Sequence, residues 1–248
     1  MATAKEITEF LNKEIEINSI EDKSCNGLQV ENTGDVKKIG FTVDACLETF
    51  QKSALAGCQM LIVHHGLIWE GIKYIKGNTY KRIKCLIDNN LALYAAHLPL
   101  DRHDKYGNNI ILANLLNLKD IKSFGFYGDK TIGFYGQTEV ELEQIKEKLK
   151  EAGMNLTCFE YGPRQIKKVT IVSGAFTDGA YQAVSLSADL YLTGENKYNY
   201  LQVAKENNLN IICAGHYLTE TLGVKALMPL LKEKFGVEVE FIENPVGL

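Results

Sequence analysis

An internal duplication constrains the fold of this 248-residue chain more than any other feature of its sequence. The segment that begins at Val36, VKKIGFTVDACLETFQKSALAGCQMLIVHHG, aligns without a gap with the segment that begins at Ile166, IKKVTIVSGAFTDGAYQAVSLSADLYLTGEN. Each starts with β-branched residues, continues with apolar residues at helical spacing and closes with a second apolar run. This order predicts strand, helix, strand, which is the building unit of a parallel sheet.

The correspondence extends to a third predicted strand in each half. NNLALYAAHLPLD and NNLNIICAGHYLTE both end in a histidine that an acidic residue follows four positions later, if one residue of slip is allowed. We therefore predict an α/β fold made of two similar lobes with mainly parallel sheets. We expect the first lobe to span residues 1–125 and the second 126–248, with the lobes intimately packed and their segments able to interlink.

The segments outside the duplication have their own patterns. GFYGDKTIGFYGQ predicts a strand pair or a turn, and EVELEQIKEKLKEAG predicts a helix that ends at Gly153. TLGVKALMPLLKEKFG then predicts an amphipathic helix and VEVEFIEN a final strand.

Composition excludes some classes of protein. The net charge of −4 argues against a surface that coats nucleic acid, although a local basic groove remains compatible with it. No apolar run approaches the roughly 20 residues that span a membrane, and the amphipathic N-terminus does not resemble a signal peptide. These two observations lead us to expect a cytoplasmic protein. The six cysteines form no C-x-x-C pair, and we expect them to be reduced, buried thiols.

Unusual polar residues cluster at the predicted strand ends. Ligands bind outside the carboxyl ends of strands in parallel α/β sheets. Neighbouring strand residues point to opposite faces, so the adjacent pair His64-His65 can share one site only if the strand stops there, as Gly66 suggests. The polar residues at this common location are His64, His65, His97, Asp101, Glu195, His216 and Glu220.

Three histidines and two carboxylates from this group form a set of candidate metal ligands. They are His64, His65, Asp101, His216 and Glu220. Taken alone, His216 and Glu220 are also compatible with a structural salt link or a helix cap, and Asp101 with a loop aspartate. Together, the set is too large for one catalytic zinc ion and suits two divalent ions, with a carboxylate such as Glu220 between them. Imidazole and carboxylate ligands do not distinguish zinc, iron and manganese.

Four further residues are each compatible with more than one role. His97 is our candidate catalytic residue, because an imidazole can move protons near neutral pH, but it could also be a ligand. His103 fits the rim of the site or a plain surface position equally well. Glu195 could contact substrate or occupy a turn, and Trp69 could stack on a planar base or cover core.

Several motifs occur in an order that is similar to a known family. They are NGLQVE (26–31), HHGLIW (64–69), HLPLDRHDKYGNN (97–109), LTGE (192–195), GHYLTETLGVKAL (215–227) and the C-terminal FIENPV. Together they resemble the dinuclear-metal-centre family of GTP cyclohydrolase 1 type 2 homologues, the YbgI, YqfO and Nif-three-like relatives. The resemblance spans essentially the whole chain, although HLPLD replaces the commoner HTNLD and HDKYGNN lacks the usual proline.

The resemblance implies a two-lobed α/β protein with paired metals in the cleft between its lobes. By motif, the implied ligands are His64, His65, Asp101, His216 and Glu220. It also implies a toroidal homohexamer whose sites face an internal cavity. Residues 124–165 look too short for the extra domain of longer relatives, so this chain resembles the compact form.

Two functions from different classes remain open. The leading hypothesis is a metal-dependent hydrolase of a nucleotide or related heterocycle, and GTP ring opening is what the family resemblance suggests. No P-loop is present to hold a triphosphate. The alternative is a non-enzymatic metal-binding protein in regulation, storage or interaction, engaging single-stranded nucleic acid through residues such as Lys73, Tyr74 and Lys76. A purely structural metal pair is a third possibility.

Overall fold

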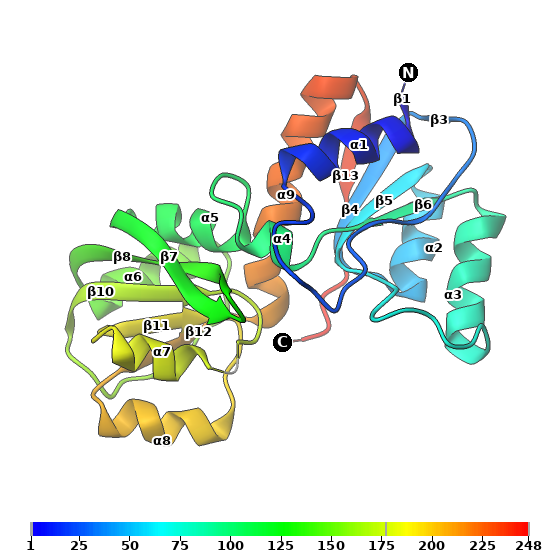
Figure 1. Ribbon diagram of the computed structural model, residues 1–248. Coiled ribbons are helices and arrows are strands. Elements are labelled where there is room, and N and C mark those ends of the chain that lie inside the picture. Colours follow the sequence, from blue (N-terminus) through cyan, green and yellow to red (C-terminus); the bar gives the residue numbers. More distant parts are fainter. Residues whose placement is uncertain (1, 177, 248) are drawn as a thin grey trace. The chain divides into compact units, whose positions relative to one another are not determined.

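The two copies of the duplication fold with the same strand register. Figure 1 shows a computed structural model of the chain, which we describe for residues 2–176 and 178–247. In the first copy Ile39 pairs with Met60 and Met60 with Ala92, all in parallel. In the second, Val169 pairs with Leu190 and Leu190 with Asn210, again in parallel. The gap-free alignment of the first two strands is therefore also their structural alignment.

The chain divides into two units. The first comprises Met1–Leu100 and Gly223–Pro245, and the second contains Asp101–Leu222. The boundary thus lies near residue 100, not at the predicted residue 125, and a C-terminal segment returns to the first unit. The reason is strand pairing, because residues 119–127 join the second sheet while residues 238–241 pair with residues 38–41 of the first.

The first unit is built on a five-stranded sheet in the order β13-β4-β5-β6-β2, parallel except for β2. Helices α2 and α3 lie side by side along one side of its strands in Figure 1. Helix α1 contacts α9 (His216–Phe235) through an edge-to-face contact of Phe10 with Phe235. Its elements are β1 (Ala2–Thr3), α1 (Ala4–Glu14), β2 (Gly27–Val30), β3 (Asp35–Val36), β4 (Lys38–Asp44), α2 (Leu47–Leu55), β5 (Met60–His65), α3 (Gly77–Asp88), β6 (Ala92–Ala95) and β13 (Glu238–Phe241).

The second unit has a six-stranded mixed sheet in the order β7-β8-β10-β11-β12-β9. Its three central strands are parallel, and β8 and β9 flank them in the antiparallel sense. Its elements are α5 (Asn108–Leu115), β7 (Lys119–Tyr127), β8 (Lys130–Glu141), α6 (Leu142–Glu151), β9 (Thr157–Phe159), β10 (Gln165–Val172), α7 (Gly179–Ser185), β11 (Leu190–Thr193), α8 (Tyr198–Glu206) and β12 (Asn210–Cys213). The division between the units falls at the end of α4 (Leu98–Asp101) and inside α9 (His216–Phe235).

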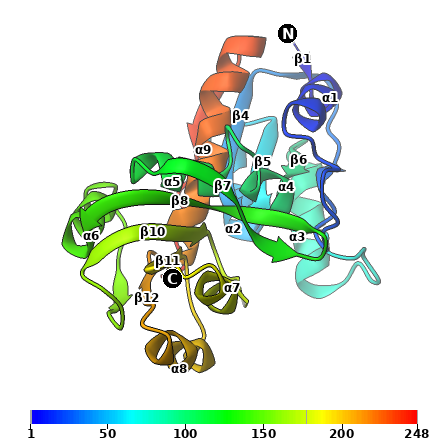
Figure 2. The same cartoon turned by 60° about the vertical axis from the view of Figure 1, so that its left-hand side comes forward.

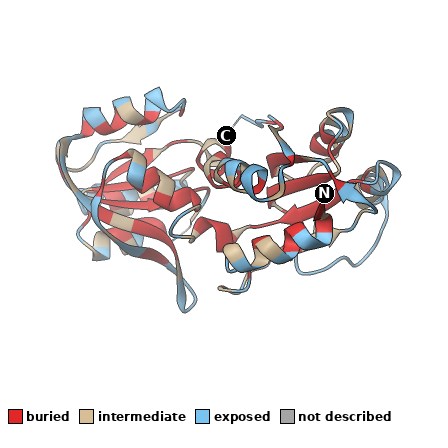
Figure 3. Ribbon diagram, turned by 90° about the horizontal axis from the view of Figure 1, so that it is seen from above, coloured by how far each residue is buried: buried red, intermediate tan, exposed pale blue. Residues whose placement is uncertain are grey.

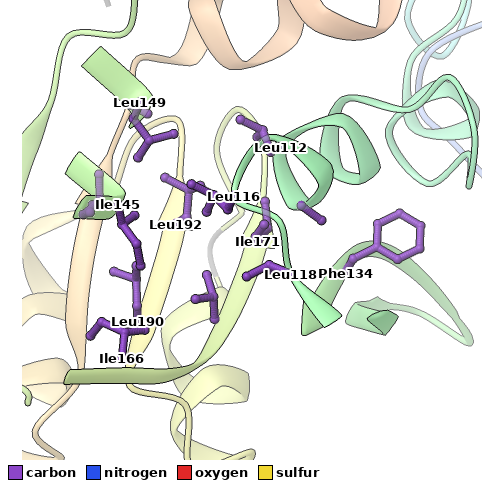
Figure 4. Close-up of a cluster of buried hydrophobic side chains, with 14 of the residues drawn as sticks. Leu112, Leu116, Leu118, Phe134, Ile145, Leu149, Ile166, Ile171, Leu190 and Leu192 are labelled. Atoms are coloured by element: carbon purple, nitrogen blue, oxygen red, sulfur yellow. The ribbon is translucent and has the colours of Figure 1, made fainter. Parts of the chain in front are cut away.

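The core of the second unit shows how helices position its central strands. Leu112 and Leu116 from the α5 segment, and Ile145 and Leu149 from α6, pack on Leu190 and Leu192 of β11 and their neighbours (Figure 4). Burial of each such side chain contributes about 1.5–3 kcal/mol. Figure 2 shows the β7–β8 ribbon and α6 from a second direction.

Burial is greatest in the strands of both sheets (Figure 3). Residues 60–63 of β5 are fully buried, as are Leu190, Tyr191 and Leu192 of β11. The site-bearing strands are therefore anchored by core residues up to the point where their polar residues begin. Among the described residues, no helix is both long and apolar enough to cross a bilayer.

Candidate metal centre

His64 ends the buried part of β5 and is itself fully buried. Its Nδ1 atom lies 2.9 Å from the backbone carbonyl oxygen of Ala96, at the end of the neighbouring strand β6. A carbonyl oxygen only accepts hydrogen bonds, so Nδ1 carries the proton and donates it. The lone pair of the neutral ring is then on Nε2, which is the nitrogen that a metal ion would bind.

His65, the last residue of β5, has the same arrangement with a carboxylate. Its Nδ1 atom lies 2.8 Å from Oδ1 of Asp44. Asp44 is the last residue of β4 and is the register partner of His65 in the parallel ladder. A carboxylate that accepts from Nδ1 orients the ring and increases the basicity of Nε2, as in many carboxylate–histidine–zinc sites.

His97 follows β6 and contacts Asp22 from the segment before β2. Its Nδ1 atom is 3.0 Å from each Asp22 carboxylate oxygen, and its backbone N–H donates to Asn26. Burial alone would raise the pKa of Asp22, but hydrogen bonds from His97, Asn26 and Ser24 outweigh it and lower the pKa to about 2. Asp22 is therefore an ionised, buried acceptor that orients the His97 ring.

These three histidines converge within the first unit. One ring nitrogen from each of His64, His65 and His97 lies within 4.8 Å of the others. Trp69 borders the group, with its ring centroid 5.0 Å from that of His97 and 6.2 Å from that of His65. Its indole N–H donates to the backbone oxygen of Gly66, which holds the ring in place.

In the second unit, His216 and Glu220 share one face of the first turns of α9. The Nε2 atom of His216 lies 3.2 Å from Oε2 of Glu220, and its Nδ1 atom lies 3.4 Å from Oε1 of Glu195. Only 4% of the Glu220 side chain is exposed, against 28% of His216. A buried carboxylate next to an imidazole needs a compensating cation or hydrogen bonds, because burial of an isolated charge is costly.

The loop after β10 fits closely around this pair. Gly174 has a φ angle of +59°, and a Cβ atom there would lie 2.0 Å from Oε1 of Glu220 and 3.2 Å from Nε2 of His216. The backbone N–H of Gly174 donates to the hydroxyl of Thr219 on α9. Only glycine combines this backbone conformation with such a close approach.

Asp101 lies on the other side of the same loop. It is 6% exposed, and its Oδ1 atom accepts from Ser173 Oγ at 2.9 Å and from Asn108 Nδ2 at 2.8 Å. The adjacent residues Ser173 and Gly174 therefore contact Asp101 and Glu220 respectively. The second unit thus gathers two buried carboxylates and one imidazole around a single loop.

The donor chemistry of both groups fits divalent metal ions. Two ligands bound at about 2.1 Å from one ion lie about 3.0–3.4 Å apart, which is the spacing between His216 Nε2 and Glu220 Oε2. In the first unit, the oxygen acceptors hold the proton on Nδ1 and so leave the lone pair on Nε2 of each neutral ring to bind a metal ion. The structure therefore contains groups of histidine and glutamate side chains that could bind a metal ion.

The structure places the residues selected from the sequence in two groups. The first unit brings together His64, His65 and His97, and the second brings together Asp101, His216 and Glu220. Glu195 contacts His216, whereas the Nδ1 atom of His103 accepts from the backbone N–H groups of Lys105 and Tyr106 and orders a turn.

Sequence reasoning missed the groups that orient these side chains. Asp44 could have been found, because it ends the strand next to the one that His65 ends and so must lie beside it. Asp22 carries no comparable signal, since it lies in an irregular segment far along the chain from His97. Ser173 and Gly174 at the end of β10 occupy strand-end positions like those of the selected residues.

Comparison with known proteins agrees with the resemblance seen in the motifs. Residues 2–245 match Duf34/NIF3 (NGG1p interacting factor 3). A protein named GTP cyclohydrolase 1 type 2 homolog from Pyrococcus abyssi is 46% identical over 248 residues, which is 98% of this chain and 99% of that protein. The chain belongs to the Duf34/NIF3 family.

Solved structures confirm the predicted fold class within the Duf34/NIF3 family. The crystal structure of TTHA1606 from Thermus thermophilus is 36% identical with a TM-score of 0.91 and covers 100% of both chains. A structure of the protein ybgI is 29% identical, also with a TM-score of 0.91 and 100% coverage of both chains. The predicted family and the two similar α/β lobes are therefore correct.

Proposed function

We propose that this Duf34/NIF3 protein is a hydrolase of a nucleotide or related heterocycle that depends on two divalent metal ions. The ligands in this proposal are His64, His65, Asp101, His216 and Glu220. The observation that carries it is the orientation of the buried His64 and the partly buried His65, whose Nδ1 atoms meet oxygen acceptors so that Nε2 presents its lone pair. Histidines that are oriented by oxygen acceptors and lie at the carboxyl ends of strands are typical of a metal site. Placing them in a core without such a function would cost free energy.

The names of relatives support the reaction class. The relatives from Pyrococcus abyssi and Archaeoglobus fulgidus are both named GTP cyclohydrolase 1 type 2 homolog, at 46% and 40% identity. Two divalent ions would supply an activated water at neutral pH and stabilise negative charge that develops on the substrate. Zinc, iron and manganese all fit the ligand types.

Residues around the proposed metal ligands have distinct roles in this proposal. Asp44 and Ala96 hold the rings of His65 and His64, and the loop at Gly174 holds Glu220. His97, oriented by ionised Asp22, presents Nε2 to the same group and is our candidate for moving a proton to or from substrate. Trp69, 40% exposed beside His97, offers a face on which a planar ring could stack.

Turnover assays test the proposed hydrolase directly. The purified protein is loaded in turn with zinc, manganese or ferrous iron, and assayed against GTP and a panel of other nucleotides and purine-like heterocycles. We expect turnover that disappears on chelation and returns on reloading, and that falls at least 100-fold in Glu220→Ala. Turnover that survives chelation, or that Glu220→Ala retains in full, would exclude this mechanism.

A specific surface feature favours the non-enzymatic alternative. The segment after Trp69 exposes Tyr74 (71%) and Tyr80 (50%), and the ammonium of Lys76 lies 5.1 Å from the Tyr74 ring centroid. Exposed aromatic rings with nearby lysines are typical of surfaces that bind single-stranded nucleic acid. Salt-sensitive binding of an oligonucleotide that Tyr74→Ala weakens, together with no turnover under any metal, would favour this function over hydrolysis.

Assembly and location complete the proposal. The family resemblance supports a toroidal homohexamer, and we also propose that the protein is cytoplasmic. Light scattering during gel filtration tests the assembly, and a mass six times that of one chain is the expected result. A monomeric or dimeric mass at micromolar concentration would contradict it.

A further inference from the structure

A cavity in the second unit lies where the loops after β10 and β11 meet the start of α8. Its volume is about 240 Å³, and its lining residues are Ala175, Phe176, Glu195, Asn196, Lys197 and Tyr200. These residues follow the carboxyl ends of two neighbouring parallel strands. That edge is where open α/β sheets bind their ligands.

The start of α8 makes this cavity favourable for an anion. Lys197 is the N-cap residue of α8, and no side chain bonds the helix at this cap. The first backbone N–H groups of a helix have no partner within the helix, and they carry the positive end of its dipole. The exposed ammonium group of Lys197 adds a full positive charge at the same place.

Asn196 gives an independent indication of a ligand. Its Nδ2 atom is buried, and among the described residues it has no hydrogen-bond partner. A buried amide donor without an acceptor is destabilising, so such groups are rare and need an explanation. An acceptor oxygen of a ligand in the cavity that Asn196 lines would provide one.

The duplication shows what the equivalent loop binds in the first unit. In the gap-free alignment, Lys197 corresponds to Leu67 in the loop after β5. The Oε1 atom of Gln29 accepts there from the backbone N–H groups of Leu67 and Ile68, at 2.7 and 3.1 Å. In the first copy, an oxygen of the chain's own Gln29 thus accepts from the backbone of this loop. In the second copy, a cavity lies at the equivalent loop.

The remaining walls suit a planar group and adjoin the candidate metal ligands. Phe176 and Tyr200 supply aromatic surface, and Tyr200 is held by an edge-to-face contact with Tyr181 at 5.5 Å. Glu195 faces His216, with Oε1 3.4 Å from Nδ1. Glu195 therefore lines the cavity and also contacts the His216–Glu220 pair.

We propose that this cavity binds the phosphate group of a small phosphate monoester, with the ring that bears it against Phe176 and Tyr200. In this arrangement Asn196 Nδ2, Lys197 and the first N–H groups of α8 donate to the phosphate oxygens. The role of this ester as substrate rests on the proposed hydrolase, but its binding does not. The cavity also supplies the phosphate contacts for which the sequence contains no P-loop.

Calorimetric titration of the full chain with phenyl phosphate tests the proposal, with phenol as the comparator that lacks the phosphate. Both the metal-loaded and the chelator-treated protein are titrated, because phosphate could also bind to metal ions. We expect phenyl phosphate to bind both forms and phenol to bind at least 10-fold more weakly. Absence of phenyl phosphate binding to the chelated protein would overturn the proposal.

Two substitutions localise the binding, each with a matched control on α8. Lys197→Ala is expected to weaken phenyl phosphate binding about 10-fold, while Lys205→Ala removes the same charge from the last turn and leaves binding unchanged. Asn196→Asp replaces the donor by a carboxylate and is expected to abolish binding, unlike Asn207→Asp at the C-cap. Wild-type affinity in Lys197→Ala and Asn196→Asp would contradict the site. No turnover with any metal, together with intact phenyl phosphate binding, would refute the proposed hydrolase and support the cavity as a phosphate site.

Discussion

At the residue scale, the ring orientation of each histidine in the first unit is set by an oxygen acceptor at Nδ1. The acceptors are the carbonyl of Ala96 and the carboxylates of Asp44 and Asp22. The sequence predicted the histidines because two adjacent imidazoles at a strand end are unusual. It did not predict Asp22, because a single aspartate in an irregular segment has no distinguishing pattern.

The contact between Asp44 Oδ1 and His65 Nδ1 allows a test of whether the orientation of the His65 ring matters for metal binding. Asp44→Asn removes the carboxylate that accepts from His65 and leaves the shape of the side chain nearly unchanged. We expect metal affinity to fall about 10–100-fold, measured by competition with a chromophoric chelator. Glu48→Gln, at an exposed residue paired with Lys52 on α2, is the control and should bind metal like the wild type. Unchanged affinity in Asp44→Asn would show that this contact does not tune the site.

Asp22 predicts a pH dependence of stability with a definite sign. Its pKa is lowered from 3.8 to about 2 in the fold, so its ionised form stabilises the fold above about pH 4 and this contribution is lost as the pH falls through 2. After solvent screening, Asp22→Asn should lower the free energy of unfolding by about 1–2 kcal/mol at pH 7.

Urea unfolding of the chelated protein between pH 7 and pH 2 measures this contribution. The difference between wild type and Asp22→Asn should shrink below about pH 4. The exposed Asp35→Asn serves as the control and should follow the wild type. A difference that grows on acidification would contradict the assignment of Asp22 as an ionised acceptor.

At the element scale, the duplication predicted the central strands of both sheets and their register. The match extends to details, since Gln59 in one copy and Asp189 in the other accept from equivalent pairs of backbone N–H groups. The boundary between the units was missed because β13 pairs with β4, 200 residues earlier, and no local pattern predicts such pairing. The antiparallel strands around β10–β12 likewise depend on long-range contacts.

The loop between β10 and α7 positions the candidate metal ligands of the second unit, because it contacts Asp101 and Glu220. Gly174→Ala should remove metal binding by the second unit, because the new Cβ atom would meet the Glu220 carboxylate. Gly153→Ala is a matched control, since Gly153 also has a positive φ angle, +83°, but nothing lies within 4 Å of a Cβ atom there. Both variants should lose about 1 kcal/mol of stability from backbone strain. Metal content, measured by plasma mass spectrometry, should fall in Gly174→Ala alone, and equal metal content in the two variants would refute the close fit at Glu220.

At the scale of the whole molecule, metal binding and folding stability must be linked. A ligand that binds only the folded state stabilises it by about 2.7 kcal/mol at a concentration of 100 times its Kd. Chelation should therefore lower the melting temperature by several degrees in calorimetry. In a double variant that lacks one proposed metal ligand from each unit, His64→Ala with Glu220→Ala, added metal should not change the melting temperature. A response like that of the wild type would place the metal elsewhere.

The central claim is that five side chains hold two divalent ions, and metal counting per chain tests it most directly. The protein is purified without chelators, dialysed and analysed by plasma mass spectrometry together with an amino-acid analysis. We predict about two divalent ions per wild-type chain, fewer than one in His64→Ala and in Glu220→Ala, and two in His103→Ala, which removes the one histidine outside both groups. A wild-type chain that retains no metal after growth with zinc, iron and manganese, or ligand variants that retain both ions, would contradict the account.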